Sequence, residues 1–230
     1  MNRHHLLYGM LALCLVAVGC HDGPMYALKA ANPVFRSQWA ADEKLGITDT
    51  TRREALEELV SALPNLSPAD QAKWQDDLLA IMENDPSPHH RFLAVRAGAG
   101  ISGEPGLEVL SKGLQDEASK VRICACQELA KRREPQATEL LTKTVGNESD
   151  SDVRLSAVAA LSGHKGEQVR VALRGALESQ DPAFQLAAMR SLKTVTGANL
   201  PPNAEAWVAY LDGNPSDKKP GFADRLKNMF

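Results

Sequence analysis

The sequence predicts an all-α protein, an α-solenoid of about five antiparallel helix pairs. The first observation is a recurring spacing in which an Arg or Gln follows the start, an Ala lies four places on, and a Leu or Gly lies eight places on. These segments start at residues 51, 90, 121, 153 and 184. The last four starts recur about every 31 residues, which is typical of arrays whose units bury their apolar stripes only against their neighbours. The second observation is that Gly or Pro residues separate each segment from another apolar segment, so each repeat is predicted to be helix, turn, helix.

Residues 1–19 are predicted to be a signal peptide rather than part of the fold. The apolar run from Leu6 to Val18 is too short to span a bilayer as a stable helix. It ends in Ala17-Val18-Gly19-Cys20, which resembles a bacterial lipoprotein signal. The resemblance implies that Cys20 is acylated and becomes the mature N-terminus, although Ala17 replaces the usual Leu. An ordinary signal peptide with a nearby cleavage site is the alternative.

A lipidated Cys20 would hold the protein at a membrane, because several acyl chains exceed the two signals that stable anchoring requires. The expected location is therefore the cell envelope, on a membrane that faces the periplasm. His21 follows the Cys, in place of the acidic residue that retains some lipoproteins in the inner membrane, which favours the outer membrane. The net charge of −3 argues against a nucleic-acid partner.

Residues 20–48 are expected to form a tether and an arm. The arm brings three large apolar side chains close together: Val34, Phe35 and Trp39. It either covers the open end of the first helices or acts as a free recognition segment.

The repeat domain is expected over residues 49–212. In its first pair, one helix runs from about Asp49 to Leu63, capped by Asp49 or Thr50. The next starts with Ser67 as cap and Pro68 in the first turn, and continues to about Asn84. The caps expected for later first helices are Ser119, Asp150 or Ser151, and Asp181.

The recurring residues carry a resemblance to a known repeat family. Asp, a few residues, Val-Arg, then Ala and Leu at fixed spacing is similar to HEAT repeats, in the short form also found in phycobilisome-lyase-type proteins. The similarity covers roughly residues 85–195, with a weaker extension back to about residue 49. In such arrays the repeated Arg often hydrogen-bonds an acidic residue or loop carbonyls of the adjacent unit. The resemblance therefore implies a structural ladder of Arg91, Arg122 and Arg154, from which Gln185 departs.

The same resemblance implies where a protein partner would bind. Second helices of HEAT arrays line the concave side, where extended partners usually lie. The exposed polar residues expected there are mixed in sign: Glu108, Lys112, Glu139, Lys143, Arg170 and Arg174. For each residue alone a solvated surface position is the simpler interpretation, and only the set indicates a binding groove.

No catalytic motif is recognisable, and neither a cofactor nor a metal site is expected. HExxH, GxSxG, a Gly-rich phosphate loop and CxxC do not occur in the sequence. Cys124 and Cys126 lie two apart on a predicted helix, so they are expected to pack rather than to form a disulfide with each other or bind a metal. His90, at a helix start, and His164, in a turn, are expected to be ordinary surface residues.

Residues 213–230 are expected to form a linker and a short amphipathic helix. Before them, Asn203 can cap a final helix whose Trp207 closes the end of the array. The last segment places four apolar side chains on one helical face: Phe222, Leu226, Met229 and Phe230. This face either docks on the array, contacts a partner protein or inserts into an anionic membrane surface.

Together these observations favour a non-enzymatic, membrane-anchored scaffold for protein–protein interaction in the cell envelope. The alternative, taken from the lyase-type repeats, is a lyase-like or accessory factor that acts on a bound small molecule or pigment. A deep apolar pocket with convergent polar groups would favour that alternative, and an open polar groove would favour the scaffold. A third option is an envelope structural protein without a specific partner.

Overall fold

The computed structural model describes residue 33 and residues 46–213, and the regular elements in that range are all helical. The signal peptide, nearly all of the tether and arm, and the C-terminal amphipathic helix lie outside the described residues. The chain divides into two units, residues 1–55 and 56–230. Helix α4 (Asp49–Ala62) starts in the first unit. There the Thr48 hydroxyl oxygen accepts the N–H of Thr51 at 3.1 Å, so Thr48 caps α4 instead of Asp49 or Thr50.

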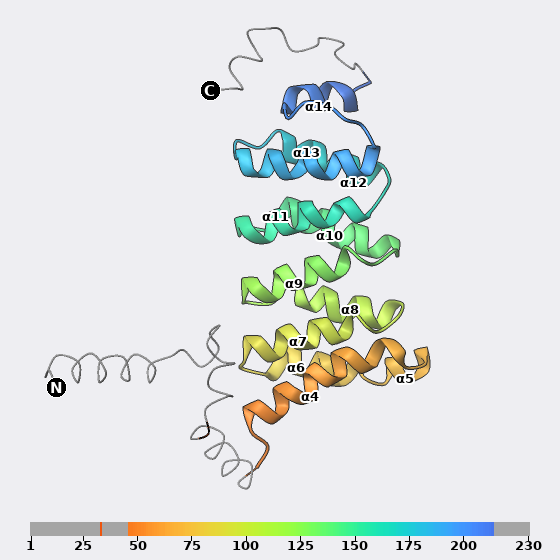
Figure 1. The fold of residues 1–230 in the computed structure, drawn as a ribbon, viewed down its shortest axis with the longest axis vertical. Coiled ribbons are helices and arrows are strands. Elements are labelled where there is room, and N and C mark those ends of the chain that lie inside the picture. The colour runs from red at the N-terminus through yellow and green to blue at the C-terminus, as the bar shows by residue number, and fades with distance from the viewer. Residues whose placement is uncertain (1–32, 34–45, 214–230) are drawn as a thin grey trace, which may run out of the picture. The chain divides into compact units, whose positions relative to one another are not determined.

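The second unit is a row of antiparallel helix pairs, which confirms the predicted α-solenoid (Figure 1). The first helices of successive pairs are α7 (Pro88–Gly98), α9 (Ser119–Leu129), α11 (Ser151–Ala160) and α13 (Pro182–Thr196). Their second helices are α8 (Glu104–Gly113), α10 (Pro135–Asn147), α12 (Glu167–Leu177) and α14 (Ala204–Leu211). A short 3₁₀ turn, η2 (Leu161–Gly163), follows α11.

The pairs stack layer upon layer. Helix α9 packs between α7 and α11, and α11 packs between α9 and α13, so the first helices form one continuous row. The second helices form a parallel row, in which α8 packs on α6 (Gln75–Asn84) and α12 packs between α10 and α14. Because each pair leaves an apolar stripe that only its neighbours can cover, the stripes merge into one core along the row.

The recurring sequence positions form this core. Val121, Ala125 and Leu129 have no exposed surface, and their counterparts in the next repeat are equally buried. Each fully buried Leu or Val contributes about 1.5–3 kcal/mol through its removal from water. The second repeat has Gly98 in place of the Leu because a Cβ at that position would lie only 2.5 Å from Val109 Cγ1. The weak match of this repeat therefore reflects a close helix contact and not a break in the array.

The first pair differs from the expected single second helix. Helix α4 ends in a 3₁₀ turn, η1 (Leu63–Asn65), and Ser67 then caps α5 (Pro68–Ala72), which is separate from α6. Gln71 at the end of α5 is buried, donates from Nε2 to the carbonyls of Leu63 and Leu66 at 3.1 and 3.2 Å, and accepts the N–H of Ser102 at 3.0 Å. These bonds hold α5 against the turns of its own repeat and of the next one.

The caps of the later first helices follow the expectation in two of three cases. Asp150 and Asp181 accept backbone N–H groups of the first turns of α11 and α13. At α9 the cap residue is Ala118 rather than Ser119, and Asp116 Oδ1 instead accepts the Ala118 N–H at 2.8 Å. The acidic side chain therefore still anchors the loop, but it does so from two residues before the cap residue.

The turn at Gly163 makes a close approach to the preceding layer. A Cβ at this position would lie 2.3 Å from the Ala130 carbonyl oxygen. We expect Gly163→Ala to lower the free energy of unfolding by about 1–3 kcal/mol, because backbone must move to relieve the overlap. Urea unfolding measures this change. Gly175→Ala is the matched control, since nothing lies near its Cβ and Ala should stabilise α12 by about 0.5–1 kcal/mol. Equal stability of Gly163→Ala and the wild type would contradict the close approach.

Candidate functional site

The loops between repeats are joined by arginines that point along the row. Arg91 Nε and Nη2 donate to the two carboxylate oxygens of Asp116 at 2.7 and 3.0 Å, and Nη1 donates to the Asp85 carbonyl at 2.9 Å. One repeat later, Arg122 Nε and Nη2 donate to Glu148 at 2.9 and 3.3 Å, and Nη1 donates to the Asp116 carbonyl at 2.8 Å. Each guanidinium thus connects the loop before its repeat with the loop after it.

Charge on both partners is favoured at these contacts. The hydrogen bond to Asp116 raises the pKa of Arg91. Burial by itself raises the pKa of Glu148, but the backbone N–H of Asp150 and the guanidinium of Arg122 outweigh it, so the pKa of Glu148 is lowered. Two-pronged charged hydrogen bonds of this kind fix geometry as well as adding stability. Arg91 and Arg122 therefore act inside the fold and are not available to a partner.

The arrangement changes in the fourth repeat. Gln180 stands where the earlier repeats have Asp116 and Glu148, so the following loop supplies no carboxylate at that position. Arg154 instead places Cζ 4.3 Å from the centroid of the Phe184 ring, a cation–π contact. The implied ladder is therefore ionic at Arg91 and Arg122 but not at Arg154.

Gln185 keeps part of the pattern. Its Nε2 donates to the Ser179 carbonyl at 2.7 Å, in the loop before its own repeat. Arg91 and Arg122 make the corresponding carbonyl contact in their repeats. The amide thus replaces the backbone bond of the arginine and loses only the bond to a carboxylate.

The six polar residues expected on the second helices form a row and not a cluster. They lie in pairs on α8, α10 and α12. Lys112 Nζ lies 2.9 Å from Glu83 Oε1, and Arg174 Nε lies 3.2 Å from Asp212 Oδ1, so both are tied to the adjacent second helix or its end. Glu108 accepts a bond from Gln75 of α6, and Arg170 pairs with Glu167 on its own helix.

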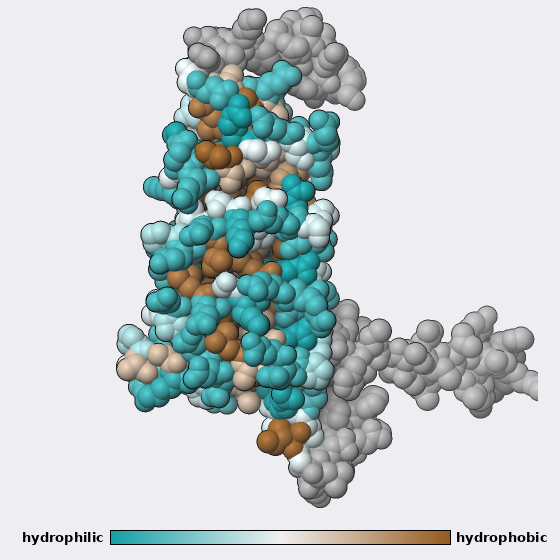
Figure 2. Space-filling model, turned by 180° about the vertical axis from the view of Figure 1, so that it is seen from behind, coloured by the Kyte–Doolittle hydropathy of each residue, from teal (hydrophilic) through white to brown (hydrophobic). Residues whose placement is uncertain are grey.

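Of the three helices α8, α10 and α12, only α10 carries expected site residues whose side chains make no such contact. Glu139 and Lys143 on α10 have no side-chain partner in the part of the chain that the structure describes. Cys20, the expected lipidation site, lies outside that part. Figure 2 shows hydrophilic side chains over much of the face turned away from the viewer in Figure 1, with separate apolar patches between them. The row of second helices therefore carries no single concentrated site.

A second set of bonds, which sequence reasoning missed, joins the turns within the pairs. Arg132 is 9% exposed, and it donates to the carbonyls of Ile101 and Gly103 at 2.7 and 2.8 Å. In the next repeat His164 Nε2 lies 3.0 Å from the Leu129 carbonyl, and Nδ1 lies 2.9 Å from Thr138 Oγ1. A neutral His164 with its proton on Nε2 satisfies both contacts.

The two histidines expected at the surface are therefore buried. His164 is 5% exposed because its turn folds back onto the previous repeat. His90 is 1% exposed, and its Nδ1 lies 3.1 Å from Asp85 Oδ2 in the preceding loop. A signal was present in the sequence, since Ile101, Arg132, His164 and Val195 occupy the same position in successive repeats. The aliphatic residues at this position mark it as facing inward.

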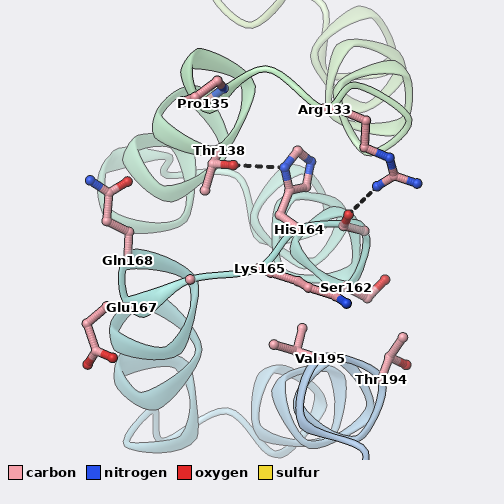
Figure 3. A pocket seen from close by; sticks show the side chains of 12 residues that line it. Arg133, Pro135, Thr138, Ser162, His164, Lys165, Glu167, Gln168, Thr194 and Val195 are labelled. Carbon is pink, nitrogen blue, oxygen red and sulfur yellow. Dashed lines mark hydrogen bonds between the residues drawn. The ribbon is translucent and has the colours of Figure 1, made fainter.

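An open cleft of about 800 Å³ lies beside His164 (Figure 3). The turn after α9 and the turn before α12 line one side, and Thr194 and Val195 at the end of α13 line the other. Figure 3 shows Lys165 between these two sides, with Val195 pointing toward it. Val195 has no polar group to bond the previous turn, and α13 continues to Thr196 before Gly197 ends it with φ 74°. The end of α13 therefore lies beside the turn of the fourth repeat without a polar contact from Val195, and the cleft lies between them.

Cations dominate the rim of this cleft. Arg133 and Lys165 are exposed, and Arg133 donates one bond to the Gly163 carbonyl. Glu167 supplies a carboxylate, which the Arg170 guanidinium approaches to 2.5 Å. Burial lowers the pKa of His164, and the nearby charge of Arg133 lowers it further against the opposing bond to the Leu129 carbonyl. His164 therefore forms a neutral wall, and the net charge at the opening is positive.

Among residues 46–213, the remaining cysteines and metal-binding side chains form no further cluster. Cys124 and Cys126 are buried and free, and burial raises the pKa of each thiol to about 12. Over residues 46–213, no group of three His, Cys, Asp or Glu side chains is placed to hold a metal ion. In the same residues, no helix has the length and apolar character that crossing a membrane requires.

The arrangement of helix pairs agrees with the comparison to known families. Residues 76–162 match the family model for HEAT repeats. The matched stretch runs from α6 to α11 and includes Arg91, Arg122 and Arg132. It begins within the expected weaker extension toward residue 49 and ends before α12. No curated protein matches the chain significantly. The lipoprotein signal and the lyase-type form of the repeat stay predictions.

The contact of Arg122 with Glu148 should contribute strongly to stability. The two side chains are 15% and 11% exposed, so removal of the guanidinium leaves a partly buried carboxylate without its charged partner. We expect Arg122→Ala to lower the free energy of unfolding by about 2–4 kcal/mol. Urea unfolding at pH 7 measures it. Arg170→Ala, which breaks an exposed pair, should cost less than about 1 kcal/mol. A loss of stability in Arg122→Ala as small as that in Arg170→Ala would contradict a structural role for the Arg122–Glu148 contact.

His164 should make stability depend on pH. Its pKa is lowered in the fold, so the unfolded chain takes up the proton first, near pH 6.5. The stabilisation is complete above that pH and is lost as the pH falls below it, by at most about 1.4 kcal/mol per pH unit. Urea unfolding between about pH 7.5 and 5 should show a shallower decline for His164→Gln than for the wild type. Parallel curves would mean that His164 does not titrate with unfolding.

Proposed function

We propose that this protein is a non-enzymatic, lipid-anchored scaffold that holds a partner protein in the cell envelope. The observation that carries the proposal is the row of HEAT-like pairs. Since each layer contacts only the layers beside it, the fold offers long faces and edges in place of one enclosed cavity. Such surfaces suit an extended protein segment, and the matched repeats support this role.

The side-chain geometry favours the scaffold over the lyase-like alternative. The clefts are open, and the one of about 800 Å³ beside His164 is rimmed by Arg133, Lys165 and Glu167. An accessory factor for a pigment or another small molecule would need an enclosed, mainly apolar pocket with a few convergent polar groups. The cysteines that could attach such a molecule, Cys124 and Cys126, are buried among core side chains with strongly raised pKa values.

The anchoring part of the proposal rests on the sequence before the fold begins. The apolar run that ends at Val18 is followed by Gly19-Cys20, the arrangement that resembles a lipoprotein signal. A lipid on Cys20 and a tether over residues 20–48 would hold the repeats beside a membrane while leaving them able to bind.

Crosslinking in intact cells followed by recovery of the full chain from membranes tests both parts. The native protein should fractionate with membranes and incorporate labelled palmitate, and Cys20→Ser should do neither. Both forms should recover the same partner, because the repeats and not the lipid make the contact. Recovery of no specific partner by either form would refute the scaffold. Palmitate labelling of Cys20→Ser equal to the native level would refute the anchor.

A further inference from the structure

We propose that the cleft between the fourth and fifth repeats binds an extended, acidic peptide segment of the partner. This inference deepens the proposed scaffold function and rests on it. The site is defined by Arg133, Lys165, the first turn of α12, and the end of α13 at Val195. It lies at the edge of the array formed by the turns within pairs and takes in the ends of second helices, away from Glu139 and Lys143 on α10.

The cleft is a built feature, because it appears where a repeating contact stops. In the third and fourth repeats, Arg132 and His164 close their turns onto the turns before them. Val195 occupies the same position in the fifth repeat and is only half-buried. The cleft therefore lies where this polar contact is missing, between the turn of the fourth repeat and the end of α13.

The opening extends into a second cleft of about 670 Å³. The two share Lys165, Gly166, Glu167 and Val195, and the second continues to Tyr210, Leu211 and Gly213 at the end of α14. Together they form a groove along the last two repeats. Its length and open ends suit a chain segment that passes through, rather than a small molecule that is enclosed.

Charge identifies the occupant. The whole protein carries a net charge of −3, but Arg133 and Lys165 project at this cleft and the carboxylate of Glu167 is engaged by Arg170. Gly166, the N-cap residue of α12, provides no side-chain cap and lines the cleft, so the positive end of the helix dipole lies at the opening. Carboxylates of a partner therefore meet favourable charge at this cleft, although the protein as a whole is negative.

The apolar residues that line the groove add a second requirement for the sequence of the bound segment. Val195, Tyr210 and Leu211 are each half-buried and lie along the groove. An extended chain presents alternate side chains to opposite sides, so acidic residues alternating with aliphatic ones could meet both the cations and this apolar strip. The expected ligand is thus a segment in which Asp or Glu alternates with Leu, Ile or Val.

Fluorescence anisotropy on the full chain in detergent tests the assignment. The probe is a fluorescein-labelled peptide of about twelve residues with alternating Glu and Leu, compared with a counterpart carrying Gln for Glu. We expect the Glu peptide to bind and the Gln peptide to bind at least about tenfold more weakly, and added salt to weaken the Glu peptide only. Arg133→Glu with Lys165→Glu should weaken the Glu peptide by about tenfold or more.

A matched variant separates this site from overall charge. Lys120→Glu with Lys143→Glu changes the net charge equally, and both lysines are exposed at the edge formed by the loops between repeats or on α10. Binding should survive in that variant. If it is lost there and kept in Arg133→Glu with Lys165→Glu, the peptide lies on the second helices and the inference is wrong. Equal binding of the Glu and Gln peptides would also overturn it.

Crosslinking in cells distinguishes failure of this cleft site from failure of the scaffold function itself. A partner that crosslinks to the native chain and to Arg133→Glu with Lys165→Glu in equal amounts keeps the scaffold and removes this site. Absence of any crosslinked partner removes the scaffold first. Partner recovery that falls with the cleft variant, while Lys120→Glu with Lys143→Glu keeps it, supports both.

Discussion

The structure depends on the fact that no helix pair can bury its own apolar stripe. The recurring Val, Ala and Leu positions are covered only when another pair lies on each side, so the layers hold one another in place. Apolar burial is non-directional and supplies the cohesion between neighbouring layers. Polar contacts at the two edges fix the register: Arg91 and Arg122 at the loops between repeats, and Arg132 and His164 at the turns within them. Specific geometry therefore comes from the edges, and cohesion comes from the middle.

The fold was predictable because one sequence pattern repeats along the chain. Five segments with the same internal spacing, and Gly or Pro between the helices, indicated the pairs, their order and most of their bounds. Failures were local. Thr48 and Ala118 took cap positions expected for their neighbours, and the break between α5 and α6 had no clear sequence signal. Caps depend on which of several adjacent polar groups reaches a free N–H, and spacing alone does not determine that.

The candidate site was far less predictable. A repeat pattern tells which residues face the core, but a cleft depends on where that pattern is interrupted in space. The sequence pointed to charged residues on the second helices. In the structure, Lys112 and Arg174 there form ion pairs with Glu83 and Asp212. Arg133 and Lys165 were not predicted, because nothing local distinguishes a lysine at a cleft from one on open surface. His164 was expected at the surface, since single histidines in turns usually lie there.

The fourth and fifth repeats differ from the others at both edges at once. Gln180 supplies no carboxylate to Arg154, and Val195 supplies no polar bond to the fourth turn. Contacts between α11 and α13, including the bond of Ser191 to the Val158 carbonyl at 2.8 Å, then carry that junction with the packing of their second helices. The helices of this joint pack on one another as they do at the earlier joints, so what the joint lacks is the pair of polar contacts that joins the other repeats at their loops and turns. A partner bound across that joint would restrict the motion of the fourth repeat relative to the fifth, and its dissociation would restore that motion.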